Sequence, residues 1–106
     1  MTPAIGFGIH SKEQTRNITA PVFIVAGKGD SNTPIQFNAL VYHQLIPSSE
    51  LYLLGDNIDH YIFLNEATEF GKTIAPEITI DKEGVDRKKI HEEVAIMVIH
   101  FFEKHL

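Results

Sequence analysis

The sequence predicts an α/β fold with a parallel sheet, on three observations. A continuously apolar, β-branched run opens at Pro21 and closes at Gly27, and a second apolar run, residues 50–54, closes at Gly55. Between them lies a segment whose apolar residues recur with a helical period. Apolar runs without polar alternation are typical of parallel strands covered on both faces. The order strand, helix, strand predicts a βαβ unit with a right-handed crossover.

The composition limits the kinds of protein that this chain can be. Its 106 residues suffice for one domain, and 43% hydrophobic and 22% charged residues describe an ordinary folded chain. The absence of cysteine excludes thiolate catalysis and cysteine-ligated metals. The net charge of −5 disfavours binding to nucleic acid or to anionic membranes. No apolar run approaches the roughly 20 residues of a membrane helix and no secretory signal is seen, so we expect a cytoplasmic protein.

The strand–helix–strand unit has recognisable start and stop signals. The first strand is expected at residues 22–26 and the second at residues 50–54. Thr33 as cap and Pro34 at the first helical position predict a helix that continues to about Ile46. The apolar face of this helix is expected to consist of Phe37, Leu40, Val41 and Leu45.

The rest of the chain is predicted to be loops and helices. Residues 1–20 read as loops with one helical turn near residues 11–14, and residues 61–86 as irregular chain with a short helix at residues 65–70. Asp86 is expected to cap a final helix, residues 87–105, whose charged start is interpreted as a solvated face. Its apolar stripe consists of Ile90, Val94, Met97, Val98 and Phe101.

Asp30 and His60 are the candidate site residues, because each follows one of the two strands. Ligands of open α/β sheets bind at the carboxyl ends of the strands, and neighbouring strands lie about 5 Å apart. A carboxylate that accepts from one imidazole nitrogen fixes the tautomer, and the other nitrogen can then take a proton from a nucleophile. The alternative is that Asp30 caps the next helix or shapes the turn and that His60 is an ordinary loop histidine.

The same loops admit other interpretations. Gly27-Lys28-Gly29 follows a strand, but the third glycine of a dinucleotide fingerprint is replaced by Asn32 and no acid ends the next strand. Asp56 and Asp59 precede His60, and either could be its partner in place of Asp30. A metal site there lacks a calcium-hand pattern or a second histidine at i+4.

The run from Ile18 to Asp30 resembles the strand and acid loop near the end of the α/β-hydrolase domain. The continuation through Thr33-Pro34, Ile46-Pro47, residues 51–54 and residues 60–64 resembles it too. The segments near Val85-Asp86-Arg87, Ile90-His91 and Phe101-Phe102, and the start at Pro3-Ala4-Ile5-Gly6, are similar to the dienelactone-hydrolase-like branch.

The resemblance implies that residues 1–106 are a single partial domain, the last strand-helix-strand-helix of an incomplete three-layer sandwich. It implies carboxylic ester or lactone hydrolysis with Asp30 as catalytic acid, His60 as catalytic base, and neither cofactor nor metal. The family's G-x-S-x-G nucleophile elbow is absent, and Ser11, Ser31, Ser48 and Ser49 do not lie on such a turn. The isolated chain is therefore expected to lack the nucleophile and the oxyanion hole, and to be inactive alone.

The same incompleteness predicts a partner. Two apolar strands with one crossover helix and one terminal helix would leave residues 22–26 as an open hydrophobic edge, which invites pairing. We expect a homo-oligomer or a complementary hydrolase half, and a small-molecule ester substrate if the site is completed. The alternative function is a non-catalytic truncated hydrolase module that acts as an oligomeric or interaction protein.

Overall fold

A computed structural model gives the structure of the protein, and it describes residues 12–106. Within this range the sheet consists of β1 (Val22–Gly27) and β2 (Ser49–Leu54). The strands run parallel, with Val22 opposite Ser49 and Gly27 opposite Leu54. The predicted α/β class and the predicted parallel pairing are therefore confirmed.

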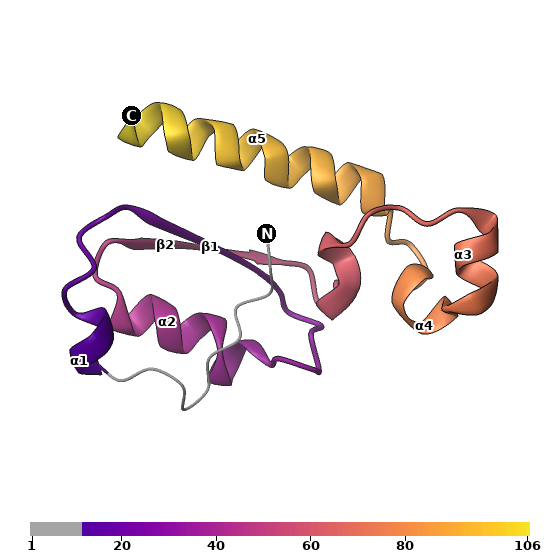
Figure 1. Ribbon diagram of the computed structural model, residues 1–106, viewed down its shortest axis with the longest axis horizontal. Helices are drawn as coiled ribbons and strands as arrows, with labels where there is room; N and C mark the ends of the chain where they lie inside the picture. Colours follow the sequence, from indigo (N-terminus) through magenta and orange to yellow (C-terminus); the bar gives the residue numbers. More distant parts are fainter. Residues whose placement is uncertain (1–11) are drawn as a thin grey trace.

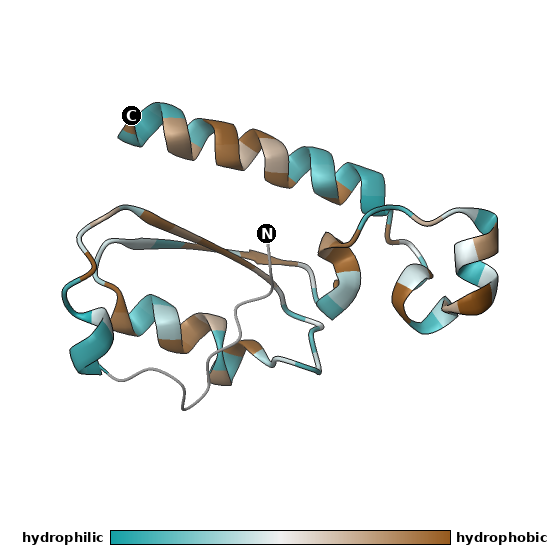
Figure 2. Cartoon of the chain, viewed as in Figure 1, coloured by the Kyte–Doolittle hydropathy of each residue, from teal (hydrophilic) through white to brown (hydrophobic). Residues whose placement is uncertain are grey.

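Two helices cover the two faces of the sheet. Helix α2 (Ala39–Leu45) lies against one face and α5 (Arg87–His105) against the other (Figure 1). Ile24 and Ala26 of β1 pack with Ala39 on the α2 side, whereas Val25 packs on the α5 side. In the hydropathy view β1 is brown, whereas β2 begins in hydrophilic colours and becomes brown toward its end (Figure 2).

The core on the α5 side follows the stripe expected from the sequence. Val94 is 0% exposed and packs with Leu54, Ile58 and Ile62. The other predicted members of the stripe also face the sheet: Ile90, Met97 and Val98 pack against this core, and Phe101 stacks on Phe23 with ring centroids 5.4 Å apart. The predicted cap is present, since the Asp86 carboxylate accepts a hydrogen bond from the Lys89 N–H at 3.2 Å.

The first predicted helix is wrong in its start and its continuity. A 3₁₀ turn, η1 (Ile35–Phe37), is separated from α2 by Asn38, whose φ of −131° and ψ of −88° are not helical. Pro34 is extended rather than helical, and the Thr33 hydroxyl donates to Asp30 instead of capping. The break turns Phe37 outward, where it is 55% exposed rather than part of the expected apolar face.

The segment after β2 also differs from the prediction. It forms a 3₁₀ helix, η2 (His60–Phe63), and two short helices, α3 (Glu69–Ile74) and α4 (Pro76–Thr79). The short helix expected at residues 65–70 begins later, because the Thr68 hydroxyl caps α3 by accepting from the Gly71 N–H at 3.1 Å.

Near the start of the described range, α1 (Lys12–Thr15) matches the predicted helical turn. Ser11 and the resemblance at Pro3-Ala4-Ile5-Gly6 lie outside the described residues. No helix in residues 12–106 is long and apolar enough to span a bilayer.

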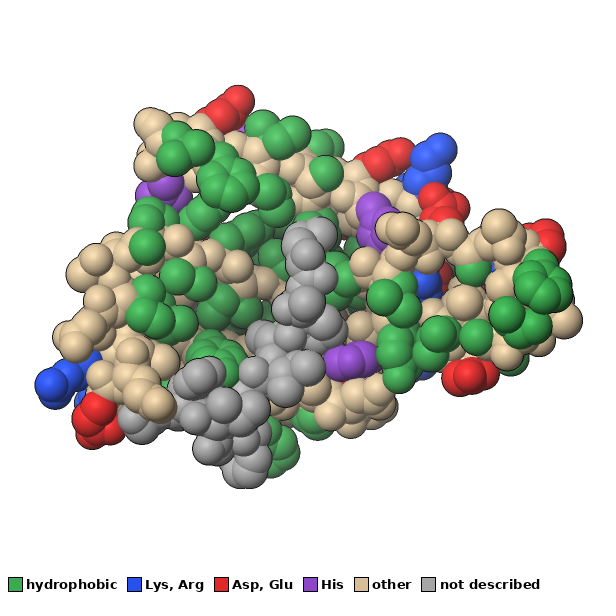
Figure 3. All heavy atoms as spheres, viewed as in Figure 1, with side chains coloured by type: hydrophobic (Ala, Val, Ile, Leu, Met, Phe, Trp, Pro, Cys, Tyr) green, Lys and Arg blue, Asp and Glu red, His purple; other side chains and the backbone are tan. Residues whose placement is uncertain are grey.

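Helix α5 leaves part of the sheet uncovered. A cavity of about 470 Å³ opens between β1 and α5, and Figure 3 shows hydrophobic side chains gathered there around a hollow. Its lining is apolar: Pro21, Phe23, Val25, Phe63, Val98, Phe101 and Phe102. Because β1 pairs only with β2 in the described part of the chain, its other edge carries no strand there.

Candidate functional site

The structure brings Asp30 and His60 together, as the positions of the two strands predict. Asp30 follows β1, and His60 begins η2 after β2. The Oδ2 atom of Asp30 and the Nδ1 atom of His60 are 2.9 Å apart. The aspartate is buried and the imidazole is 18% exposed, so a shielded carboxylate faces a ring that solvent or a ligand can reach. The expected contact is confirmed, and its catalytic use remains a prediction.

Two glycines allow the loops after β1 and β2 to approach this closely. The Gly29 N–H donates to the Ile58 carbonyl at 3.0 Å. A Cβ atom on Gly27 would lie 2.3 Å from that carbonyl oxygen, and one on Gly29 would lie 2.5 Å from the carbonyl oxygen of Asp56. These distances are shorter than carbon and oxygen tolerate, so the pair of glycines is explained by loop packing.

The Asp30 carboxylate is fully engaged. Its Oδ1 accepts from the N–H groups of Asn32 and Thr33 at 3.0 and 2.7 Å, and its Oδ2 accepts from the Thr33 hydroxyl at 2.7 Å. Burial alone would raise the pKa of Asp30, but the hydrogen bonds from Thr33 and His60, with the charge of His60, outweigh it. They hold the pKa of Asp30 below its ordinary value of 3.8, so the carboxylate is ionised at neutral pH.

This network determines which nitrogen of His60 carries the proton. An ionised carboxylate only accepts, so the Nδ1 atom facing Asp30 must donate. The Thr33 hydroxyl oxygen, 3.2 Å from Nδ1, already donates its hydrogen to Asp30 and can share the Nδ1 proton. In the neutral ring the lone pair is then on Nε2, and nothing within residues 12–106 hydrogen-bonds to that atom.

Asn32, Thr33 and Tyr61 surround the pair of Asp30 and His60, which we call the dyad, and the sequence analysis assigned neither Asn32 nor Thr33 this role. Thr33 was expected to cap a helix, yet its hydroxyl and N–H both serve Asp30. The Tyr61 ring stands edge-on to His60 with centroids 5.0 Å apart, and its hydroxyl accepts from the Asn32 side-chain amide at 3.2 Å. Aspartate side chains commonly accept hydrogen bonds from the N–H groups two and three residues ahead in turns. This tendency was the sequence signal from which the contacts of Asp30 with Asn32 and Thr33 could have been predicted.

The acids of the second loop are not partners of His60. The Asp59 carboxylate accepts from the Tyr61 N–H at 3.1 Å and caps η2. The Asp56 side chain is 91% exposed and lies 3.5 Å from the Lys28 ammonium. Asp59 therefore stabilises the loop, and Asp56 forms an exposed ion pair on it. The described residues contain no group of three or more side chains suited to hold a metal ion.

The serines of the described chain do not complete the dyad. Ser48 and Ser49 lie at the amino end of the β2 segment, opposite the end from which His60 follows. Their hydroxyls donate to the carbonyls of Ala20 and Ile46, each at 2.7 Å. Ser31 has no hydrogen bond to His60 among residues 12–106, and Ser11 lies outside them.

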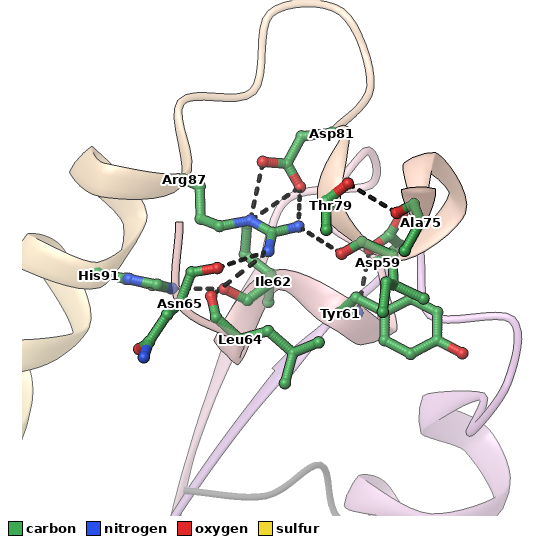
Figure 4. A network of polar contacts seen from close by, with 11 residues as sticks. Asp59, Tyr61, Ile62, Leu64, Asn65, Ala75, Thr79, Asp81, Arg87 and His91 are labelled. Carbon is green, nitrogen blue, oxygen red and sulfur yellow. Dashed lines mark hydrogen bonds and ion pairs between the residues drawn. The ribbon is translucent and has the colours of Figure 1, made fainter. Parts of the chain in front are cut away.

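Helix α5 holds the segment that carries His60 (Figure 4). Arg87, expected on a solvated face, is instead 5% exposed and paired with Asp81, with Nη2 and Oδ1 2.7 Å apart. Its guanidinium also donates to the carbonyls of Leu64 and Asn65, both at 3.4 Å. His91 donates through Nε2 to the Ile62 carbonyl. The charged start of α5 therefore contains one buried residue, Arg87, which binds the segment after His60. The spacing of apolar residues along the helix did not reveal this contact.

Comparisons of the chain with protein family models, with curated proteins and with solved structures found no match. The contact between Asp30 and His60 does not depend on the resemblance to α/β-hydrolases, because it follows from two loops at one edge of a parallel sheet. What this pair can do chemically is to hold a proton on Nδ1 and to offer the Nε2 lone pair as a base.

Proposed function

We propose that this chain provides the acid and base of a serine-type hydrolase that acts on carboxylic esters or lactones. The observation that carries the proposal is the buried, ionised Asp30 bonded to Nδ1 of an accessible His60. In such a pair the carboxylate orients the ring and stabilises the imidazolium that forms when Nε2 takes a proton. Asp30 is then the orienting acid and His60 the general base.

The nucleophilic serine is supplied from outside this sequence. The chain has no G-x-S-x-G turn, and the serines in the described residues are engaged elsewhere or do not bond His60. Transfer of a serine proton to Nε2 would generate the attacking oxygen, and the imidazolium would return that proton to the leaving alcohol. Both steps use the one ring nitrogen that the described chain leaves unbonded.

The test of this proposal is the hydrolysis of p-nitrophenyl acetate by the purified chain, with labelling by a fluorophosphonate serine probe. We expect no labelled serine and no enzymatic turnover, only a slow reaction in which His60 acts as a base on water. His60→Ala should lower this rate to the level that the other histidines and the lysines of the chain give. The control His43→Ala should not, because His43 bonds Ser49 at the far end of β2.

Equal rates for the wild type and His60→Ala would contradict the proposed base. A labelled serine whose labelling requires His60 would place the nucleophile within this chain and overturn the claim that it comes from outside.

A second candidate function is a non-catalytic module that associates with another copy of itself. The apolar cavity of about 470 Å³ beside the unpaired edge of β1 favours it. An open strand edge and an exposed apolar patch both promote association between chains. Pairing of two β1 edges would continue the sheet across the two copies and bring their cavities together.

We expect sedimentation equilibrium to give a mass above the 11.9 kDa of one chain. Phe102→Asp should restore the monomer, because Phe102 lines the cavity and is 51% exposed. The matched control is Phe70→Asp on α3, where the side chain is 73% exposed and not part of the cavity lining. A monomeric wild type at high concentration, or equal effects of both substitutions, would exclude association through this surface.

A further inference from the structure

Within two residues of His60, hydrogen bonds from other elements of the described chain hold the backbone at two points. Before it, the Ile58 carbonyl accepts from the Gly29 N–H at 3.0 Å. After it, the Ile62 carbonyl accepts from His91 of α5. The first point joins the segment to the loop that carries Asp30. The second point joins it to the terminal helix, and Figure 4 shows this contact.

The second point has no evident substitute. Ile62 is 1% exposed and lies in the core against Val94. Val94 is about one turn of α5 after His91. Within residues 12–106 the hydrogen bond from His91 is the one that its carbonyl accepts. A buried carbonyl that loses its donor must move toward another donor or toward water.

The element between the two points is short and has few internal hydrogen bonds. η2 is a single 3₁₀ turn, and its internal bond from the Ile62 N–H to the Asp59 carbonyl is long, at 3.4 Å. His60 is the first residue of this turn, so a shift of Ile62 is transmitted to its ring. The Nδ1 atom must stay within bonding distance of both Asp30 and Thr33, which tolerates displacements of only about 0.5 Å.

We propose that His91 is a positioning residue for the dyad: by holding the Ile62 carbonyl it keeps Nδ1 of His60 on Asp30. This inference rests on the proposed function only in assigning a catalytic use to the dyad. The hydrogen bond needs a proton on Nε2 of His91, so the two histidines carry their protons on different nitrogens. His60 donates through Nδ1 and His91 through Nε2.

The test reads the tautomer of His60 from the ¹⁵N chemical shifts of its ring, in the 106-residue chain at about pH 9, above the ordinary histidine pKa. In the wild type we expect the proton on Nδ1. His91→Leu removes the donor, and we expect loss of this preference, with a mixture containing the Nε2–H form. His91→Gln places an amide donor near the same position, so it should restore the Nδ1–H form.

The matched control is His100→Leu, the same substitution on the exposed part of α5. Backbone amide spectra of each variant establish that it is folded. A folded His91→Leu with an unchanged His60 tautomer, or a His91→Gln that behaves like His91→Leu, would overturn the inference and leave the proposed function intact. A wild type without the Nδ1–H form would overturn the dyad and the inference together. Equal p-nitrophenyl acetate rates for the wild type and His60→Ala, with a normal tautomer response, would overturn the proposed function alone.

Discussion

Asp30→Asn should abolish the reaction that depends on His60 while leaving the fold intact. The Oδ1 position accepts from two backbone N–H groups, so an asparagine keeps its oxygen there and turns its NH₂ group toward His60. The amide would then donate to Nδ1, the ring proton would move to Nε2, and the base would be lost. In an assembled Ser-His-Asp site such a change lowers kcat on the order of 10⁴-fold.

The first measurement is the rate at which the chain hydrolyses p-nitrophenyl acetate. The second is the kcat of an enzyme assembled from this chain and the part that supplies the serine. Its KM is recorded as well, to show that substrate binding is nearly unchanged. The matched control is Asp56→Asn, because that side chain is 91% exposed and its carboxylate lies 3.5 Å from the Lys28 ammonium rather than at the imidazole of His60. A loss of less than about tenfold in kcat of the assembled enzyme would reject Asp30 as the orienting acid.

Asp81→Asn should produce a large loss of stability. The Asp81 carboxylate accepts from Nε and Nη2 of Arg87 at 3.0 and 2.7 Å, and the two side chains are 15% and 5% exposed. Removing the negative partner leaves a buried guanidinium uncompensated, which costs about 3–5 kcal/mol. Small domains have about 5–15 kcal/mol in all, so urea denaturation should show a much lower midpoint.

The control for this substitution is Glu69→Gln, which removes an acid from an exposed ion pair. Glu69 is 3.0 Å from Lys72, but its side chain is 92% exposed, so solvent already screens the pair. We expect no measurable change in the urea midpoint for this variant. An Asp81→Asn midpoint as high as that of Glu69→Gln would show that Arg87 does not depend on its acid.

Signals within single segments of the sequence predicted the two strands and the final helix. Residues 22–26 and 51–54 are continuously apolar because helices pack on both faces of the sheet, and this is visible without coordinates. The final helix begins at Arg87, after the cap Asp86, as predicted, because the cap and the apolar stripe are features of one continuous segment. The contact of Asp30 with His60 was also predictable, since parallel strands deliver their following loops to one edge.

Tertiary contacts decided what local preference could not. Thr33 is a good cap by propensity, but the buried Asp30 carboxylate recruits its hydroxyl and N–H, and the predicted helix breaks at Asn38. Arg87 reads as a surface charge until the carbonyls of a distant segment and Asp81 surround it. A side chain's partner across 20 or more residues is set by packing of the whole chain, and no periodicity within one segment records it.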